Sequence, residues 1–313
     1  MANRWWLYQN ERFPILRHGL SIAAVCFGAM VYSLRSRSHF AFPEVSALLV
    51  AFVGTFIFFL QLRIADEFKD YDEDLAHRPY RPVQRGLVRL SELKCIAFAG
   101  AGIQFGLALW TGPHILLPLF IVWAYMLLMT KEFFVPNWLK RRPVVYLLSH
   151  MLIMPLIYFF ITVCDWKAAD AAIPNGLHWL LGMGFFNGIV IEIGRKIRSP
   201  LDEEHGVATY SALWGPERAT LVWIGMLMVT MIFALIAAHQ IHFTVPMAWL
   251  LAVPILAALI GASRFIYYPA QGRGMRHVDI DQAAVAHDLA LRRLDKSHPT
   301  HVRSELVDLV KRI

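Results

Sequence analysis

Long apolar segments alternate with short polar ones through the first 262 residues of the chain. The apolar runs at 45–62, 115–129 and 221–237 each approach the ~20 residues that a helix needs to cross the hydrocarbon core of a bilayer. Hydropathy predicts spans near residues 15–33, 45–64, 92–110, 114–130, 144–163, 177–197, 218–238 and 244–262. The expected fold is all-α, a polytopic membrane bundle of eight to nine transmembrane helices around a central cavity.

The remainder of the chain is polar. We expect residues 1–263 to form the membrane bundle and residues 264–313 a cytoplasmic tail. The segment 281–295 of this tail has a helical pattern, and the pattern leaves open a weakly hydrophobic ninth helix. Residues 1–17 are aromatic and basic and lack the apolar core of a cleaved signal, so the first span is expected to remain as an anchor.

Basic residues concentrate on alternate sides of these spans. They occupy the N-terminus, the tail and the loops after the second, fourth and sixth spans, whereas the other loops are short or poor in Lys and Arg. The positive-inside rule therefore places both termini and the even-numbered loops in the cytoplasm. The loop after the first span, with Arg35 and Arg37, is the exception. Loop asymmetry also explains the net charge of +7 without a nucleic-acid partner.

Composition narrows the class of protein further. Hydrophobic residues make up 57% of the chain and charged residues 17%, against about 45–50% and about 25% in ordinary soluble domains. These values exclude a disordered chain, a cytosolic enzyme and a secreted domain held by disulfides. The three cysteines have no paired spacing, so we expect no metal or redox role for them.

The loop after the second span is strongly acidic. It holds six carboxylates within nine residues: Asp66, Glu67, Asp70, Asp72, Glu73 and Asp74. Asp66, Asp70 and Asp74 recur every four residues and would share one face of a helix, where like charges repel unless they share a cation. Mg²⁺ suits such a site, since it binds one or two carboxylates and completes its shell with water and phosphate oxygens. The structural alternative is a solvated, charged helix end.

A turn rich in Arg and Pro follows this loop and ends in Arg81-Pro82-Val83-Gln84-Arg85-Gly86. With the aspartates, it resembles the first signature of the UbiA superfamily of intramembrane prenyltransferases. The resemblance implies that Asp66, Asp70 and Asp74 bind Mg²⁺ and the diphosphate of an isoprenoid donor, with Arg81 contacting the diphosphate. Asp66-Glu67 stands where Asn-Asp is usual in the family.

The loop after the sixth span is similar to the second signature of the family. Its end, from Gly206 to Gly215, fits, and Asp202 stands where the second acid of an Asp-x-x-x-Asp pair belongs, but Arg198 occupies the place of the first. We expect Glu192, a carboxylate within the sixth span, to replace it, because acids at such depth are costly unless they bind something. A pair between Glu192 and Lys196 or Arg195 is the structural alternative.

The resemblance implies roles for further residues of this loop. Asp202 and Glu203 would join Glu192 in metal binding, and Arg195, Lys196 and Arg198 would bind the leaving diphosphate. Lys131, at the end of the fourth span, is a further candidate for the diphosphate, with a lysine extending to the membrane interface as its structural alternative.

The expected function is an Mg²⁺-dependent prenyltransferase that ionises an isoprenyl diphosphate and transfers the prenyl group to an acceptor, expected to be aromatic. A membrane terpene cyclase would ionise the same donor without an acceptor. A transporter is the alternative from another class, although the carboxylates cluster at one membrane face rather than along a pathway. A CDP-alcohol phosphotransferase also uses aspartates and Mg²⁺, but its Asp-x-x-Asp-Gly-x-x-Ala-Arg signature is absent.

Overall fold

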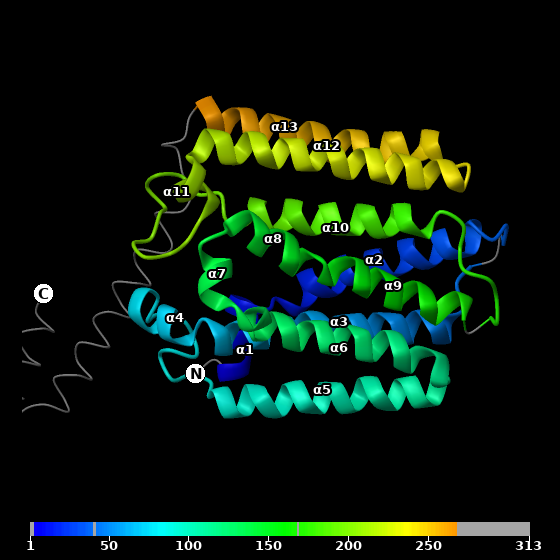
Figure 1. Cartoon of the computed structure of the whole chain (residues 1–313), viewed down its shortest axis with the longest axis horizontal. Helices are drawn as coiled ribbons and strands as arrows, with labels where there is room; N and C mark the ends of the chain where they lie inside the picture. The colour runs from blue at the N-terminus through cyan, green and yellow to red at the C-terminus, as the bar shows by residue number, and fades with distance from the viewer. Residues whose placement is uncertain (1–2, 40–41, 168, 268–313) are drawn as a thin grey trace, which may run out of the picture.

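The computed structural model describes residues 3–39, 42–167 and 169–267, and this part of the chain contains helices but no strand (Figure 1). The helices are α1 (Arg4–Arg12), α2 (Ile15–Arg35), α3 (Val45–Lys69), α4 (Tyr71–His77), α5 (Leu90–Thr111), η1 (Pro113–Ile115), α6 (Leu116–Thr130), η2 (Glu132–Phe134), α7 (Pro136–Lys140), α8 (Pro143–Met151), α9 (Ile153–Trp166), α10 (Leu177–Gly194), α11 (Tyr210–Trp214), α12 (Pro216–Gln240) and α13 (Thr244–Tyr267).

Eight helical segments of the described residues are long and apolar enough to cross a membrane. They are α2, α3, α5, η1 with α6, α8 with α9, α10, α12 and α13. The predicted all-α bundle of membrane helices is therefore confirmed. The expected tail beyond residue 267, its helical stretch at 281–295 and the ninth helix lie outside the described residues.

Two predicted boundaries differ from the structure in ways that affect the motifs. The helix of the second span continues to Lys69 rather than ending near residue 64, so Asp66 and Glu67 are helical. Hydropathy marks the hydrocarbon crossing, whereas a helix can continue into the interface where charged side chains are solvated or paired. The sixth span ends earlier than predicted, at Gly194, where glycine weakens the helix.

The fifth span is broken into α8 and α9 at Leu152. Pro155 lies in the first turn of α9. Proline has no backbone N–H to donate to the carbonyl of residue 151, and its ring prevents a regular helix in the preceding turn. The break gives the half of this span that faces the motif loops a direction of its own, separate from that of α9.

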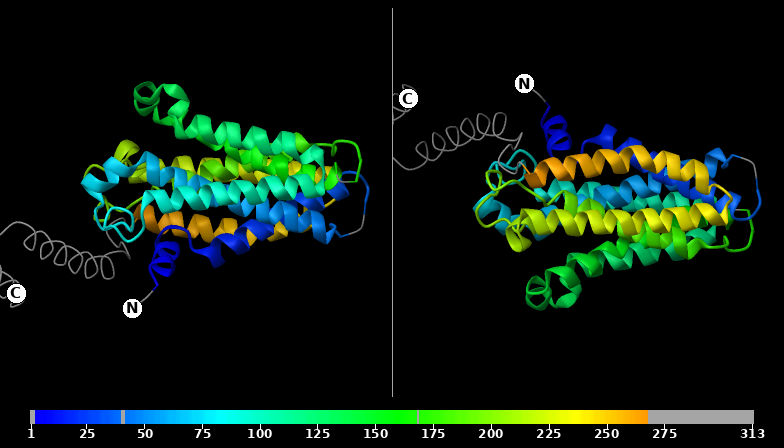
Figure 2. Two further views of the ribbon diagram at one scale, coloured as in Figure 1. Left: turned by 90° about the horizontal axis from the view of Figure 1, so that it is seen from below. Right: turned by 90° about the horizontal axis from the view of Figure 1, so that it is seen from above.

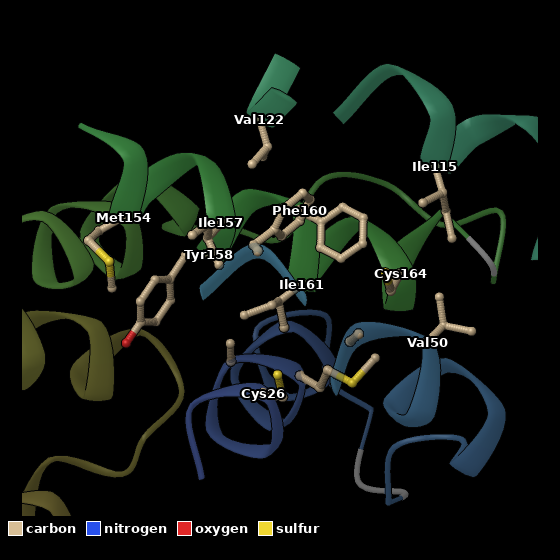
Figure 3. Packing of buried hydrophobic residues seen from close by; sticks show 14 of the residues in the cluster. Cys26, Val50, Ile115, Val122, Met154, Ile157, Tyr158, Phe160, Ile161 and Cys164 are labelled. Carbon is tan, nitrogen blue, oxygen red and sulfur yellow. The ribbon is translucent and has the colours of Figure 1, made fainter. Parts of the chain in front are cut away.

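The buried apolar core surrounds α9 (Figure 3). Phe160 of α9 packs edge-on against Phe58 of α3, with ring centroids 5.1 Å apart. A Cβ at Gly54 would lie 2.8 Å from Cζ of Phe160, so only glycine permits this approach of α3 to α9. Ile157 and Ile161, both without exposed surface, add contacts from the same helix. These contacts fix α3, which carries the acidic motif, to the centre of the bundle.

Both signature loops lie at the same end of the bundle. The views of Figures 1 and 2 place α4, α7 and α11 together at this end, which we call the motif end, with the C-terminal ends of α3 and α10 beside them. Helix α13 packs on α12 and leaves most of its apolar surface uncovered, as expected of a helix facing lipid. The motif end is therefore the end of a bundle whose outer surface is apolar.

A buried ion pair at the opposite end accounts for part of the exception to the charge rule. Arg37 donates from Nη2 to Oδ2 of Asp165 at 2.5 Å, and the two side chains are 9% and 8% exposed. Arg37 also donates from Nε to the carbonyl of Ser33. Its charge is compensated within the protein, so it does not add net positive charge to this side.

Candidate active site

The acidic segment changes direction at Asp70. Helix α3 ends at Lys69, Asp70 has φ −93° and ψ 9°, and α4 begins at Tyr71. The sequence pattern predicted one shared face for Asp66, Asp70 and Asp74. In the structure the charges of Asp66 and Asp74 both act on Asp70, but Asp74 is fully buried whereas Asp66 and Asp70 are only partly buried.

Asp74 and Glu67 form a buried ionic cluster with three arginines. Arg78 donates to Oδ1 of Asp74 at 2.9 Å, and Arg81 donates to Oδ2 of the same carboxylate. Arg12, the last residue of α1, binds Glu67. Neither carboxylate has exposed surface. Burial lowers the pKa of Arg81, and the nearby positive charges of Arg12 and Arg78 lower it further. These two carboxylates hold the Arg-Pro turn and the N-terminal segment against the bundle.

Two of the four remaining carboxylates of the motif, Asp66 and Asp70, are only partly buried. The side chain of Asp66 is 41% exposed and lies 3.4 Å from Nη1 of Arg63. Among the described residues, none forms an ion pair or a side-chain hydrogen bond with Asp70. Burial and the negative charge of Asp66 raise the pKa of Asp70 to about 6. Asp66 and Asp70 thus form a carboxylate pair whose negative charge is not fully neutralised by neighbouring basic side chains.

Glu192 forms the pair that was considered as the structural alternative. It accepts from Nε of Arg195 at 2.5 Å and lies 3.1 Å from Nζ of Lys196. Burial by itself lowers the pKa of Arg195, but the negative charges of Glu192, Asp66 and Asp70 together raise it. Arg195 therefore connects the two signature loops electrostatically, facing the carboxylate pair of the first from the end of α10.

The rest of the second loop is occupied by bonds within itself. Arg198 pairs with Glu204 at 2.7 Å, and Asp202 accepts from Ser199 at 2.9 Å. Glu203 accepts from the hydroxyls of Thr209 and Ser211 at 2.8 and 2.6 Å. Among the described residues, these contacts of Asp202 and Glu203 are with their own loop and not with Asp66 or Asp70. A pocket of about 220 Å³ beside this loop is lined by Arg198, Pro200, Glu203, Ser211, Ala212 and Pro216.

The two signature loops contact each other directly. Tyr80 donates to Oε2 of Glu204 at 3.0 Å, and burial together with the charge of Glu204 raises the pKa of this tyrosine. Gly206 has φ +79°, and a Cβ there would lie 2.2 Å from Cε1 of His77. Glycine is needed here both for the backbone conformation and for the approach of His77.

A third group of polar side chains lies next to Lys131, the candidate at the end of the fourth span. Lys131 is exposed, whereas Glu132 beside it is buried and binds Lys69 of α3, with 2.7 Å between Oε1 and Nζ. Tyr146 of α8 contacts both partners through its hydroxyl. We did not identify Lys69, Glu132 or Tyr146 as site residues from the sequence. The sequence signal for this group was Glu132, an acid that follows an apolar span.

The donor set can be compared with the needs of Mg²⁺. In the part of the chain that the structure describes, no group of three or more His, Cys, Asp or Glu side chains is arranged to hold a metal ion. Mg²⁺ commonly takes only one or two protein carboxylates and completes its shell with water and substrate phosphate. Asp66 and Asp70 fit that mode. Arg195 lies near enough to both carboxylates for their charges to raise its pKa, and Lys196 shares Glu192 with Arg195.

Comparisons with known proteins give one family model and similar solved structures. The model of the UbiA prenyltransferase family matches residues 20–278. The apo structure of a UbiA homologue from Aeropyrum pernix K1 matches with a TM-score of 0.63 and 17% identity, over 87% of this chain and 98% of that one. A structure of digeranylgeranylglyceryl phosphate synthase matches with a TM-score of 0.45 and 17% identity, over 81% and 94%. The search of curated proteins found no match.

Proposed function

Because this chain belongs to the UbiA prenyltransferase family, we propose that it is an Mg²⁺-dependent enzyme that ionises an isoprenyl diphosphate and transfers the prenyl group to an acceptor, expected to be aromatic. The observation that supports this proposal most directly is the carboxylate pair of Asp66 and Asp70, which faces Arg195 at the end of an apolar bundle. Such a site suits a substrate with an anionic head and a long apolar tail, which can reach it from the lipid.

Asp66 and Asp70 would hold Mg²⁺. The metal would supply neutralisation of the diphosphate and so make it a better leaving group. Arg195 and Lys196, held together by Glu192, would donate to the diphosphate oxygens. The allylic cation left by ionisation reacts with water, so the apolar interior of the bundle would protect it until the acceptor attacks.

The sidedness of the site follows from charge. The motif end carries the Lys- and Arg-rich loops and the N-terminal helix, and by the positive-inside rule this charge supports a cytoplasmic site. The diphosphate head of a donor at the cytoplasmic face of the membrane would then reach the basic residues of the site directly.

A product assay on purified protein in lipid nanodiscs tests the proposal. The protein is incubated with geranyl, farnesyl or geranylgeranyl diphosphate, with Mg²⁺ or EDTA, and with or without hydroxylated aromatic acceptors, and the products are identified by mass spectrometry. We expect Mg²⁺-dependent diphosphate release and prenylated acceptor. A cyclised hydrocarbon formed without acceptor would identify a terpene cyclase instead.

A matched pair of variants relates the activity to the site. Asp70→Asn should abolish Mg²⁺-dependent diphosphate release, whereas Asp72→Asn, an exposed acid of the same segment, should leave it unchanged. Equal activity of both variants, or no diphosphate release from any donor, would contradict the proposal.

A further inference from the structure

Lys69 lies beside the carboxylate pair but does not bind it. It follows Asp66 by three positions and directly precedes Asp70. An acid three residues before a lysine on a helix normally forms a favourable pair with it. Nζ of Lys69 instead lies 2.7 Å from Oε1 of Glu132, donates to the hydroxyl of Tyr146 and stands 4.7 Å from the centre of its ring.

Glu132 reaches Lys69 from an unusual turn. Glu132, Phe133 and Phe134 have φ of +49°, +52° and +61°, three consecutive left-handed residues of which none is glycine. Each such residue costs free energy and persists only where surrounding contacts determine it. Phe133 packs against the rings of Tyr125 and His150, with centroids 5.6 and 5.9 Å apart. The strain is maintained at the position that directs the carboxylate of Glu132 toward Lys69.

Tyr146 is fixed as firmly as Glu132. Its hydroxyl lies 3.3 Å from Oε1 of Glu132, and its ring stacks on His150 at 4.0 Å with an interplanar angle of 11°. Nδ1 of His150 in turn contacts the carbonyl of Tyr146 at 2.9 Å. The side chains of Lys69 and Glu132 are 17% and 8% exposed, so this contact is largely shielded from water.

We propose that Glu132, assisted by Tyr146, is a positioning residue that holds Lys69 away from Asp66 and Asp70, so that this carboxylate pair keeps its charge for a divalent cation. The inference deepens the proposed function and rests on it. Without Glu132, Lys69 would still have Asp66 three residues before it and Asp70 directly after it in its own segment. A lysine bound there would compete with the cation for the same oxygens.

Binding of Mn²⁺ as a probe metal, measured by electron paramagnetic resonance on the full chain in nanodiscs, tests the inference. The variants are Glu132→Gln, Lys69→Met and the combination of both. We expect Glu132→Gln to weaken Mn²⁺ binding about tenfold, a coupling typical of contacting charges. In the Lys69→Met background the same substitution should have no effect. Glu132→Asp should restore part of the affinity, and Glu217→Gln, an exposed acid of α12, serves as the control.

The outcomes separate this inference from its alternatives. Equal weakening by Glu132→Gln in both backgrounds would mean that Glu132 is a ligand or acts through the fold, and would overturn the inference. Unchanged binding in Glu132→Gln would overturn it as well. A crystal structure of metal-free Glu132→Gln supplies a readout without metal. Lys69 should turn toward Asp66 or Asp70 there, and a lysine still at Tyr146 would refute the inference. Absence of Mn²⁺ binding by the wild-type protein would contradict the proposed function instead.

Discussion

Asp70 and Asp74 should respond in opposite ways to the same substitution. Asp74→Asn removes the charge that binds Arg78 and Arg81, whose side chains are 11% and 16% exposed. Breaking a buried ion pair from one side costs ~3–5 kcal/mol. For a chain of this size that corresponds to a fall in Tm on the order of 10 °C. Asp70→Asn removes no partner and relieves repulsion from Asp66, so its Tm should equal or exceed that of the wild-type protein.

The two substitutions should affect activity in the opposite order, with Asp70→Asn losing more activity than Asp74→Asn. Loss of one positioned electrostatic group typically lowers turnover by ~10²-fold or more, and we expect this for Asp70→Asn. Asp74→Asn should retain turnover within about tenfold per folded molecule, because its role is to hold the turn. Thermal unfolding in detergent and diphosphate release at a temperature where both variants are folded measure the two effects. A stable but inactive Asp74→Asn would refute the structural role assigned to Asp74.

The remaining predictions concern the pH response of Asp70 and two further ion-pair groups. Because the pKa of Asp70 is raised to about 6, protons should compete with Mg²⁺ below that pH, and the apparent affinity should fall up to tenfold per pH unit in wild type but not in Asp70→Asn. The raised pKa of Asp70 also makes the stability of the metal-free protein depend on pH. The contribution of Asp70 to the free energy of unfolding is present below its unfolded pKa of about 4 and is lost as pH rises through about 6. Melting curves of Asp70→Asn at several pH values should not show this loss. Glu192→Gln should raise KM for the donor by about tenfold while the protein stays folded, since Arg195 and Lys196 lose their common partner; an unchanged KM would contradict their role. Arg37→Met should lower stability by ~3–5 kcal/mol, and combining it with Asp165→Leu should recover part of that in thermal unfolding.

The membrane architecture could be predicted from sequence because hydrophobic length is decided residue by residue. Spans such as 45–64 and 218–238 need no knowledge of their neighbours, since lipid requires each helix to satisfy its own backbone. The ends of the helices were less predictable. Hydropathy placed the end of the second span five residues early, because the helix continues past the hydrocarbon with charged residues that find partners or water.

The candidate site was predictable as a region but not as a set of roles. Spacing alone assigned Asp66, Asp70 and Asp74 to one face, since the pattern assumes an unbroken helix. The partners that bury Asp74 follow it by four and seven residues, whereas the partner of Glu67 is Arg12, fifty-five residues earlier in the chain. Glu132 illustrates the same limit. Its function depends on a left-handed turn and on Lys69 from another helix, neither of which a local pattern contains.

The helix break at Asp70 explains how one short segment can stabilise the fold and remain available to a ligand. Six like charges within nine residues would repel in any single environment. Glu67 on α3 and Asp74 on α4 instead bind Arg12, Arg78 and Arg81, where they are neutralised and buried. Asp66 and Asp70 are only partly buried, and the charge of Asp66 contributes to the raised pKa of Asp70. Complete pairing would have left no charge for a cation, and no pairing would have left the loops unattached. The segment avoids both because Glu67 and Asp74 are buried against arginines, whereas Asp70 has no ion-pair partner among the described residues.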